Sequence, residues 1–525
     1  MTNLRPARLS IKLPNHCREH PSATQKVLTL FLLFTMTMTM ATARLQAQTD
    51  TVLHSFDWTD GASPIAGLVQ GLNGNLYGAA TYGGTAGNCQ YSCAGTIFEI
   101  TPSGVYHLLY QFCSLANCAD GLYPYATLLQ ATNGNLYGTT NAGGAYGSGT
   151  VFEITPSGRL TTLHSFCSER GCADGESPTA TLIEGADHNF YGTTEIGGRH
   201  GGGTVFKITP SGKLITLYNF CALDLCSDGE SPHGGLVQGS DGNFYGTTTL
   251  GGSAFLNRCD AGCGTVFELT APGVLTTLYT FCSRANCNDG WEPVGSLVQA
   301  GNGNFYGTTL YGGIGEVCGA PGCGTVFQLT TAGTLSTLHS FCIFEGCPDS
   351  FAPFAGLTLG SNGLLYGTAE GGGNGAAFEI TTSGKFKTIY NFCSQIGCLD
   401  GAQPYSPLMQ ATNGNFYGTT YEGGSNYIHL DCPYECGTVF GISTGLAPFV
   451  ETLSASGAVG TSVVILGSNL TESTSVSFNG TAAAFTLISS TEITATVPAG
   501  ATTGKITVNT SSGTLTSSVA FRVTL

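Results

Sequence analysis

Seven copies of one sequence motif occupy most of this chain of 525 residues. Each copy reads L-Y-G-T-T or F-Y-G-T-T with small variations, then a glycine-rich stretch, then G-T-V-F or a close variant. The separations between the anchoring tyrosines run from 51 to 61 residues, and these tyrosines are Tyr77, Tyr137, Tyr191, Tyr245, Tyr306, Tyr366 and Tyr417. A period of this size is typical of a solenoid, a propeller or an array, so it constrains the fold before any local pattern does.

Each copy contains four short β-like runs, as the second copy shows. Its runs begin near Ala126, Leu136, Thr150 and Leu160 and are rich in Val, Ile, Thr, Phe and Tyr. Asn-Gly or Asp-Gly joins the first two runs in six copies, and Pro-Ser-Gly or a near variant joins the last two. Four antiparallel strands form one propeller blade, so the seven copies predict an all-β fold with a seven-bladed β-propeller.

The array begins with an extra strand and ends with one strand missing. Residues 51–56 read as a fourth strand with no blade before it, and residues 437–440 read as a third strand with no fourth after it. We therefore expect the N-terminal strand to complete the last blade and close the ring, which removes open sheet edges. An open solenoid is the alternative, and it leaves the odd strand unexplained.

The first fifty residues predict export. Residues 1–26 are polar and basic, residues 27–43 are mostly apolar, and small-residue cleavage patterns lie at 41–43 and 45–47. This predicts a secretory signal peptide over residues 1–47; an uncleaved membrane anchor is the alternative, but the apolar run is short for a span. Removing it leaves 17 − 6 = 11 basic and 33 − 1 = 32 acidic residues, a formal charge of −21. That charge argues against nucleic acid and anionic membranes as partners.

Twenty of the 21 cysteines form ten close pairs, and Cys17 lies in the predicted signal peptide. Six pairs follow the pattern F-C-x4-C-x-D: Cys113/Cys118, Cys167/Cys172, Cys221/Cys226, Cys282/Cys287, Cys342/Cys347 and Cys393/Cys398. Four pairs precede the Gly-Thr strand: Cys89/Cys93, Cys259/Cys263, Cys318/Cys323 and Cys432/Cys436. Each pair is present or absent as a unit, which predicts ten local disulfides in an exported chain. Zinc is the alternative, but neighbouring pairs do not regularly supply four ligands.

The order of antiparallel strands places both kinds of cysteine loop on one face and the tight turns on the other. Function usually resides on long, variable loops, so we expect the disulfide face to carry it. An aspartate recurs just before each blade on this face: Asp60, Asp120, Asp174, Asp228, Asp289, Asp349 and Asp400. A calcium-binding ring of carboxylates is one reading. One aspartate at the same position in every copy favours the other reading, a side chain that caps its own turn.

The histidines and nucleophiles point to no catalytic centre. His54, His164 and His339 share one repeat position with four tyrosines, which predicts a packing role. No single nucleophile has plausible partners and no G-x-S-x-G elbow is present. We therefore assign no catalytic residue, no metal ligand and no cofactor.

Two positions between Asp-Gly and the recurring proline differ from copy to copy, although their neighbours hardly vary. Large aromatic and acidic side chains at these positions are the ligand-binding candidates, because exposed rings and carboxylates on a rigid face suit stacking on sugars. Relaxed loop surface is the alternative reading of this variation. The candidates are Tyr123, Glu176, Glu230, Trp291, Glu292 and Phe351.

Two resemblances follow from these motifs. The block T-x-L-x-S-F…D-G-x-x-P…G-N-x-Y-G-T-T…G-T-V-F-x-I-T-P-S-G resembles the Gloeo/Verruco (GloVer) tandem repeat of bacterial surface proteins over about residues 50–446. The sixth copy departs from it, with Ala369 and Ala376-Ala377. Residues 447–525 hold no cysteine and alternate in short strands, similar to the immunoglobulin-like IPT/TIG domain. The resemblance implies export and surface association, and it implies no activity.

We therefore expect a signal peptide at 1–47, a propeller at 48–446 and an Ig-like β-sandwich at 447–525. The function we expect is that of a secreted or cell-surface, non-catalytic binding protein, a monomer whose disulfide face binds an extracellular glycan or surface polymer. The alternative is a polysaccharide lyase or glycoside hydrolase with carboxylates on the same face, which requires acid and base groups that converge on one pocket.

Overall fold

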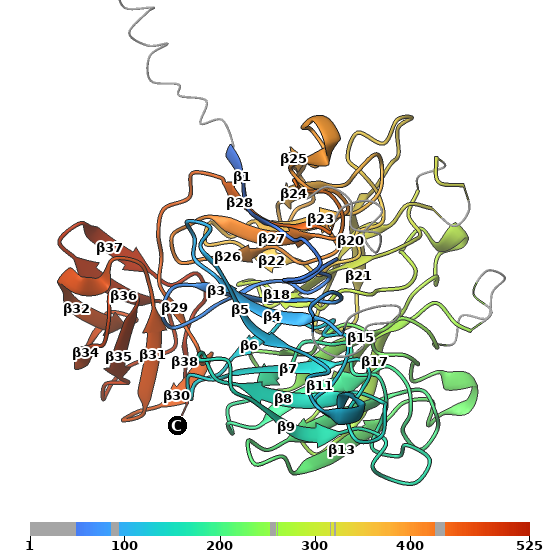
Figure 1. The fold of residues 1–525 in the computed structure, drawn as a ribbon, viewed down its shortest axis with the longest axis horizontal. Coiled ribbons are helices and arrows are strands. Elements are labelled where there is room, and N and C mark those ends of the chain that lie inside the picture. Colours follow the sequence, from blue (N-terminus) through green and yellow to red (C-terminus); the bar gives the residue numbers. More distant parts are fainter. Residues whose placement is uncertain are drawn as a thin grey trace, which may run out of the picture. The chain divides into compact units, whose positions relative to one another are not determined.

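The computed structural model describes residues 49–85, 94–252, 259, 261–314, 317–319, 322–425 and 436–524 (Figure 1). The predicted signal peptide and the cysteines Cys89, Cys93 and Cys432 lie outside the described residues. The described chain is all-β, with five 3-10 turns of three residues each (η1 to η5) besides the strands. In this part of the chain, no helix has the length and apolar character that a membrane crossing requires.

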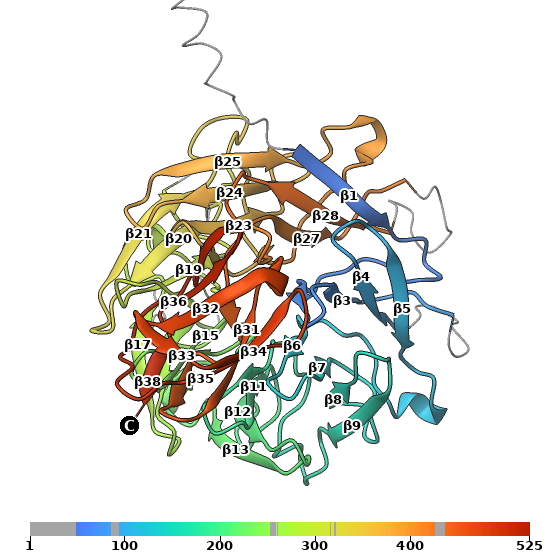
Figure 2. The same ribbon diagram turned by 90° about the vertical axis from the view of Figure 1, so that its left-hand side faces the viewer.

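Each copy of the repeat forms one four-stranded antiparallel sheet (Figures 1 and 2). In the first sheet the strands pair in chain order: β2 (Val69–Gln70), β3 (Leu76–Ala80), β4 (Thr96–Ile100) and β5 (Tyr106–Gln111). The next two sheets contain β6 (Leu129–Gln130), β7 (Leu136–Thr140), β8 (Thr150–Ile154) and β9 (Leu160–Ser165), then β10 (Ile183–Glu184), β11 (Phe190–Thr194), β12 (Thr204–Ile208) and β13 (Leu214–Asn219).

The same order continues through the remaining sheets. The fourth contains β14 (Val237–Gln238), β15 (Phe244–Thr248), β16 (Thr265–Leu269) and β17 (Leu275–Thr280). The fifth contains β18 (Val298–Gln299), β19 (Phe305–Thr309), β20 (Thr325–Leu329) and β21 (Leu335–Ser340), and the sixth contains β22 (Thr358–Leu359), β23 (Leu365–Ala369), β24 (Ala376–Ile380) and β25 (Phe386–Asn391).

The seventh sheet takes strands from both ends of the repeat region. It contains β26 (Met409–Gln410), β27 (Phe416–Thr420) and β28 (Thr438–Ser443), and β1 (Thr49–Ser55) pairs with β28 at its outer edge. The register runs from Thr49 opposite Ser443 to Ser55 opposite Thr438 and shifts once within the pair, as it does between the third and fourth strands of the other sheets. In Figure 2, β1 lies beside β28, where the other sheets have their fourth strand.

The motif residues pack against one another within each sheet. A Cβ on Gly138 of Y-G-T-T would lie 2.5 Å from the ring of Phe152, so glycine is the residue that lets this ring cross the strand. The glycine before T-V-F is equally constrained: Gly149 has φ +100°, and a Cβ there would lie 2.6 Å from Pro178 of the next copy. These close approaches explain why the glycines recur at fixed positions.

Successive sheets share their hydrophobic cores. Tyr77 and Phe112 of the first sheet pack in one buried cluster with Phe152 of the second. The cluster of the first sheet's Phe98 contains Val439 of the seventh, so the first and last sheets pack against each other as sequence neighbours do. A hydrogen bond recurs at these junctions: Thr308 Oγ1 donates to the Ala355 carbonyl at 2.8 Å, and Thr419 Oγ1 donates to that of Ala66 at 2.9 Å.

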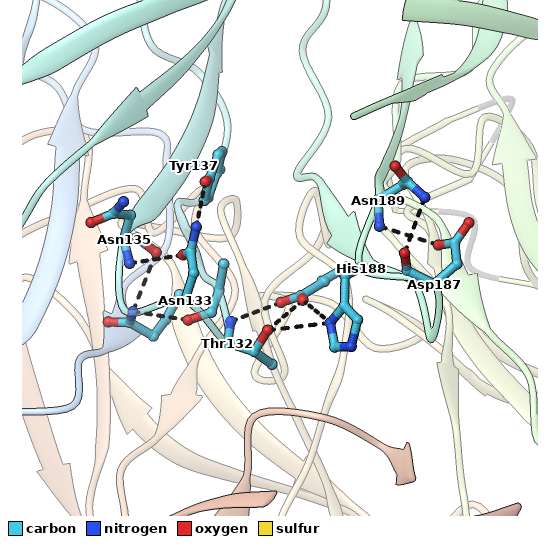
Figure 3. A network of polar contacts seen from close by, with 10 residues as sticks. Thr132, Asn133, Asn135, Tyr137, Asp187, His188 and Asn189 are labelled. Carbon is cyan, nitrogen blue, oxygen red and sulfur yellow. Dashed lines mark hydrogen bonds and ion pairs between the residues drawn. The ribbon is translucent and has the colours of Figure 1, made fainter. Parts of the chain in front are cut away.

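The tight turns are held by the anchoring tyrosines (Figure 3). Asn133 donates a 2.7 Å hydrogen bond to the hydroxyl of Tyr137. The same pair is bonded in every copy: a turn Asn donates to the tyrosine hydroxyl, and in the two copies with a turn Asp the hydroxyl donates to the carboxylate. Neighbouring turns are also joined, because Glu184 accepts hydrogen bonds from the Thr132 backbone N–H at 2.8 Å and pairs with His188 at 2.9 Å.

The C-terminal domain is an immunoglobulin-like sandwich of two four-stranded sheets and a two-stranded parallel pair. One sheet contains β29 (Glu451–Thr452), β31 (Ser462–Leu466), β35 (Glu492–Thr496) and β34 (Phe485–Leu487); the other contains β33 (Thr481–Ala483), β32 (Ser473–Phe478), β36 (Ile506–Thr510) and β37 (Gly513–Thr516). The parallel pair is β30 (Ser456–Ala458) with β38 (Arg522–Thr524). Ile465, Phe478, Ile493 and Val508 are among the buried side chains between the sheets.

The Ig-like domain contacts the tight turns of three repeats. Thr491 Oγ1 donates to the Leu72 carbonyl at 2.7 Å in the first repeat, and Arg522 donates to the Ser240 carbonyl at 2.9 Å in the fourth. In the seventh repeat the hydroxyl of Thr412 lies 2.9 Å from that of Ser468. This domain therefore packs against the turn side of the repeats, away from the cysteine loops.

Candidate binding face

A short link leads into each sheet, and it consists of the two variable residues between Asp-Gly and the recurring proline. All seven links share an unusual backbone conformation. The residue directly before the recurring proline has a left-handed conformation in all seven copies, with φ between 46° and 59°, and none of the seven is glycine or asparagine. These residues are Ser63, Tyr123, Ser177, Ser231, Glu292, Ala352 and Gln403. A left-handed non-glycine residue costs about 1–2 kcal/mol, so the surrounding contacts must fix this conformation.

Backbone hydrogen bonds fix the link at both of its polar groups. The Tyr123 N–H donates to the Ala94 carbonyl of the preceding repeat at 2.9 Å, and the Tyr123 carbonyl accepts from Asn141 N–H at 3.0 Å in its own repeat. Equivalent N–H bonds occur in the other copies, at distances from 2.7 to 3.1 Å. The link is thus hydrogen-bonded to two repeats. The side chain two residues later therefore lies at an equivalent position in every copy.

Six of the seven recurring aspartates cap the cysteine loops that precede them, and Asp60 caps a loop without cysteines. Asp120 is fully buried, and its Oδ2 accepts hydrogen bonds from the Ser114 N–H at 3.0 Å and the Tyr110 hydroxyl at 2.8 Å. The histidines of the shared His/Tyr position contact the same oxygen, as in His164 to Asp174 at 3.0 Å. The aspartate therefore caps the loop that precedes it in the chain. The ring at the His/Tyr position contacts this carboxylate and also packs on the phenylalanine that follows, as His164 does on Phe166.

The predicted short-range disulfides are confirmed wherever both cysteines are described. Eight pairs are bonded: Cys113–Cys118, Cys167–Cys172, Cys221–Cys226, Cys259–Cys263, Cys282–Cys287, Cys318–Cys323, Cys342–Cys347 and Cys393–Cys398. Cys436 is also disulfide-bonded. The carbonyls of Cys263 and Cys323 accept the link N–H groups of Glu292 and Ala352, so these bridges lie beside the links. The disulfides stiffen the loops that hold the links.

Four of the predicted binding residues occupy the first variable position, and all four are half-buried against neighbouring residues. Trp291 lies against a buried cluster that includes Cys287, and Phe351 covers Gly371, where a Cβ would lie 2.0 Å from its ring. Glu176 accepts a 3.2 Å hydrogen bond from the Ser148 hydroxyl. The carboxylate of Glu230 lies within 4.8 Å of both sulfurs of the Cys221–Cys226 bridge.

The other two predicted residues, Tyr123 and Glu292, occupy the second position, directly before the recurring proline. The Tyr123 ring is 5.5 Å from that of Tyr82. Partial burial raises the pKa of Glu292, and the nearby Trp291 indole opposes that shift. The structure thus brings Glu292 and Trp291 together and leaves Tyr123 in a separate aromatic group.

A cavity of about 140 Å³ lies where the seven links converge. The residue after the recurring proline lines it in every copy, so each repeat contributes one side chain to what we call the axial ring. Its members are Ile65, Tyr125, Thr179, His233, Val294, Phe354 and Tyr405. Unlike the strand residues, these seven differ from copy to copy, and together they place aromatic, aliphatic and polar side chains around one cavity, which is the composition of many ligand sites.

Aromatic groups cover much of the axial ring. Phe354 lies edge-to-face with Tyr405 at 5.3 Å and with His233 at 5.6 Å, and the Tyr125 hydroxyl is 3.2 Å from that of Tyr82. Burial lowers the pKa of His233 against the opposing field of Glu195, so the imidazole is neutral at pH 7. The cavity therefore presents rings, hydroxyls and a neutral imidazole.

Carboxylates lie beside these rings. Burial raises the pKa of Glu370, and the adjacent Tyr405 opposes the shift; among described atoms, its Oε2 has no hydrogen-bond partner. Burial also raises the pKa of Glu422, whose Oε2 accepts a 3.0 Å hydrogen bond from Gln403. Burial raises the pKa of Tyr311, helped by the fields of Glu292 and Glu370, so both carboxylates lie near this hydroxyl.

The sequence interpretation did not include the axial ring or Glu370. A signal was present, because the residue after the proline varies as freely as the two residues before it. The left-handed conformation of the link decides which of these three side chains lines the cavity. The sequence does not predict that conformation, because no glycine or asparagine stands at this position.

Comparison with known families fits this architecture. The Gloeobacter/Verrucomicrobia repeat matches residues 33–256 and, in an overlapping second match, residues 224–440. The chain belongs to this repeat family. The IPT/TIG domain matches residues 448–523, in agreement with the Ig-like sandwich. A Gloeobacter/Verrucomicrobia repeat region followed by an IPT/TIG domain indicates a surface-associated protein, and no curated protein matches the chain.

Among solved structures, this Gloeobacter/Verrucomicrobia repeat chain is similar to a fungal alcohol oxidase of the AA5 family in complex with copper. The identity is 11%, the TM-score is 0.51, and the match covers 91% of this chain and 100% of that chain, which shows a shared fold alone. A Bacteroides thetaiotaomicron protein of unknown function matches at 11% identity and a TM-score of 0.39, over 76% of each chain. A luciferin-regenerating enzyme matches at 13% identity and 0.36, over 60% of this chain and 89% of that one.

Proposed function

We propose that residues 48–446 form a closed seven-bladed propeller, exported after removal of residues 1–47 and followed by an Ig-like domain at 447–525. Three observations support closure: β1 pairs with β28, the first and seventh sheets share a buried cluster, and the Thr419–Ala66 hydrogen bond repeats the contact of other neighbouring sheets. The disulfides support export, because such bonds persist in oxidising compartments.

We infer that this protein is a non-catalytic surface protein that binds an extracellular glycan at the axial ring. The axial cavity carries this proposal: one variable side chain from each repeat lines it, and Tyr125, Phe354 and Tyr405 supply aromatic rings. Sugar rings stack on aromatic faces, and hydroxyls of the sugar donate to carboxylates such as Glu370. The disulfide-held links keep these groups in place, which limits the entropy lost on binding.

A polysaccharide lyase or glycoside hydrolase is the second candidate. One observation favours it: the charges of Glu292 and Glu370 both raise the pKa of Tyr311, so the two carboxylates lie near one hydroxyl. Burial raises the pKa of each carboxylate. A carboxylic acid with a raised pKa is the group that protonates a glycosidic oxygen. Binding without turnover and binding with turnover therefore require separate measurements.

The test is a glycan-array screen of the purified mature chain, with a product assay on every hit. We expect Tyr405→Ala to weaken binding at least about tenfold, because one stacked ring contributes roughly 1–3 kcal/mol. Tyr146→Ala is the matched control, since Tyr146 is 58% exposed on a loop and outside the cavity. Equal binding by both variants places the ligand elsewhere, and the absence of any glycan hit rules out this proposal.

Product formation decides between the two candidates. We expect no shortening of a bound glycan by wild type. Release of product that Glu370→Gln abolishes, with binding retained, would establish the enzyme instead. Sequencing of the secreted protein's N-terminus checks export, and we expect the mature chain to begin near residue 48.

A further inference from the structure

Two further positions in each repeat lie beside the links and the axial ring, and they are the two residues directly after the Y-G-T-T motif. In six repeats the first of these residues donates its backbone N–H to a link carbonyl, as Glu195 does to Ser177 at 3.1 Å and Glu370 to Ala352 at 3.3 Å. The second forms an isolated β-bridge with the first link residue, also in six repeats. We call the links, the axial ring and these two positions together the axial surface.

The axial surface is acidic and aromatic, and it contains no Lys or Arg in any repeat, although eleven basic residues follow residue 47 in the chain. All of its acidic residues are half-buried glutamates, and they are Glu176, Glu195, Glu230, Glu292, Glu370 and Glu422. None of them forms an ion pair with another described residue. Its aromatic residues are Tyr82, Tyr123, Tyr125, Trp291, Tyr311, Phe351, Phe354, Tyr405 and Tyr421.

Two of these glutamates border a wall of rings in the axial cavity. The wall consists of Tyr405, Phe354 and His233, since Phe354 contacts each of the other two rings edge-to-face, at 5.3 and 5.6 Å. Glu370 lies beside Tyr405, at one end of the wall. Glu195 lies near His233, at the other end. A ligand that stacks on this wall therefore meets a carboxylate at either end.

Buried polar atoms at this wall lack partners in the protein. One carboxylate oxygen of Glu370 is buried and, among the described residues, has no hydrogen-bond partner. The hydroxyl of Thr179, which lines the same cavity, is also buried and has no partner within the described chain. Because buried polar groups in folded proteins are generally hydrogen-bonded, these two atoms favour a ligand that brings its own donors.

The spacing of the carboxylates argues against a single metal ion as that ligand. A calcium ion needs six to eight oxygen ligands around one point. In the described part of the chain, every group of three metal-ligating side chains whose ligand atoms lie within 4.8 Å of one another contains at least two cysteines. The glutamates of the axial surface therefore do not converge on one point, and their charge is spread over several repeats.

An extended ligand with several ammonium groups fits this distribution. Each ammonium group supplies N–H donors for charge-assisted hydrogen bonds to a carboxylate. Ammonium groups are also attracted to the faces of aromatic rings. The absence of Lys and Arg from the axial surface means that no fixed positive charge of the protein competes with such a ligand.

We propose that the axial surface binds an amino glycan, a polymer whose sugars carry free ammonium groups, and that Glu195 and Glu370 bind those groups. This inference rests on the proposed glycan site and names its ligand class. The sugar rings stack on Tyr405 and Phe354, and the carboxylates at the two ends of the wall select the amino sugar over neutral and acetylated sugars.

The test is isothermal titration of the mature full chain, at pH 6, with three tetrasaccharides that share one backbone and differ in one substituent. The glucosamine tetramer carries an ammonium group on each ring, the N-acetylglucosamine tetramer carries an amide there, and cellotetraose carries a hydroxyl. We expect the glucosamine tetramer to bind at least about tenfold more tightly than the other two, because hydrogen bonds between charged groups are the stronger ones. Its affinity is expected to fall as sodium chloride is added, since salt screens the attraction.

A double variant, Glu195→Gln with Glu370→Gln, removes both charges and keeps the shape of the side chains. Glu345→Gln, on an exposed residue of the Cys342–Cys347 loop, is the control for loss of negative charge. We expect the double variant to lose about tenfold in affinity for the glucosamine tetramer and to bind the other two tetramers as wild type does. The control is expected to match wild type with all three, and melting curves establish that the variants are folded.

The outcomes separate this inference from the proposed function on which it rests. Equal binding of cellotetraose and the glucosamine tetramer, weakened by Tyr405→Ala, overturns the amino-glycan inference and leaves the axial glycan site in place. Absence of glucosamine tetramer binding, or equal binding by the folded double variant, also overturns the inference. Tetralysine that binds more tightly than the glucosamine tetramer, and loses affinity in the double variant, identifies a basic peptide as the partner and overturns the glycan site as well.

Discussion

The hydroxyl of Tyr279 donates a 2.7 Å hydrogen bond to the carboxylate of Asp289, which follows it by ten residues. Asp289 is fully buried and also accepts the backbone N–H groups of Ser283 at 2.9 Å and Arg284 at 3.2 Å. One carboxylate thus joins the end of β17 to the disulfide loop that follows it. Because the same arrangement recurs at Asp120, Asp228 and Asp400, it holds the cysteine loops in a common shape.

Replacing Asp289 by alanine tests this role. The variant leaves two backbone N–H groups and a phenol without their acceptor, so we expect a loss of about 2–4 kcal/mol in the free energy of unfolding. Chemical unfolding followed by tyrosine fluorescence measures it. Asp224→Ala, on an exposed residue of an equivalent loop, is the control and is expected to stay within about 0.5 kcal/mol of wild type. A variant at Asp289 as stable as this control contradicts the assignment.

Deleting residues 49–55 tests the contribution of β1. Without β1, the outer edge of β28 has no partner, and unpaired edges pair with other chains. We therefore expect the truncated chain to form oligomers or aggregates in size-exclusion chromatography with light scattering, whereas a chain that begins at residue 48 elutes as a monomer. A truncated chain that stays monomeric with an unchanged melting temperature would falsify the proposed closure.

Much of this fold follows from local sequence. Asn133-Gly134 predicts the turn between β6 and β7, and the recurring Y-G-T-T and T-V-F blocks predict the central strands. The local cysteine spacing predicts the confirmed disulfides. These features are predictable because each depends on neighbours in the chain and is repeated, so the copies act as mutual controls.

The candidate site was less predictable, since it depends on where side chains from different repeats converge. The sequence predicts an exposed ring at Trp291, yet this ring is half-buried and packs against a buried cluster that includes Cys287. His233 and Tyr405 follow prolines in separate repeats and become neighbours of Phe354 only when the sheets are arranged together. Convergence of this kind leaves no mark on local composition.

The left-handed link gives a prediction that uses Ala352. This residue is 7% exposed with φ +53°, so its Cβ adds strain and little packing. Glycine relieves about 1–2 kcal/mol of strain and costs about 0.5–1 kcal/mol in chain entropy, so we expect Ala352→Gly to be more stable by roughly 0.5 kcal/mol. Ala377→Gly in β24 is the matched control and is expected to be less stable by about 1 kcal/mol. Destabilisation of equal size in both variants argues against a strained link.

The ion pair between Asp187 and Lys207 gives a prediction on acid stability. Their charged atoms are 2.6 Å apart. Partial burial opposes ionisation, but hydrogen bonds from Lys207, Asn189 and Tyr191 outweigh it and lower the pKa of Asp187 to about 2. A lowered pKa in the folded state means that the ionised carboxylate stabilises the fold above its unfolded pKa near 4, and that this contribution is lost as pH falls towards 2. Since the pair is partly exposed, it contributes less than about 1 kcal/mol.

Asp187→Asn is therefore expected to be slightly less stable than wild type at pH 7, with a gap that narrows below pH 4 and closes near pH 2. Urea unfolding at a series of pH values measures the gap. Glu472→Gln, which changes an exposed carboxylate in the Ig-like domain, controls for the loss of one negative charge and is expected to show no such narrowing. A gap for Asp187→Asn that stays constant down to pH 2 means that the carboxylate's charge does not stabilise this turn.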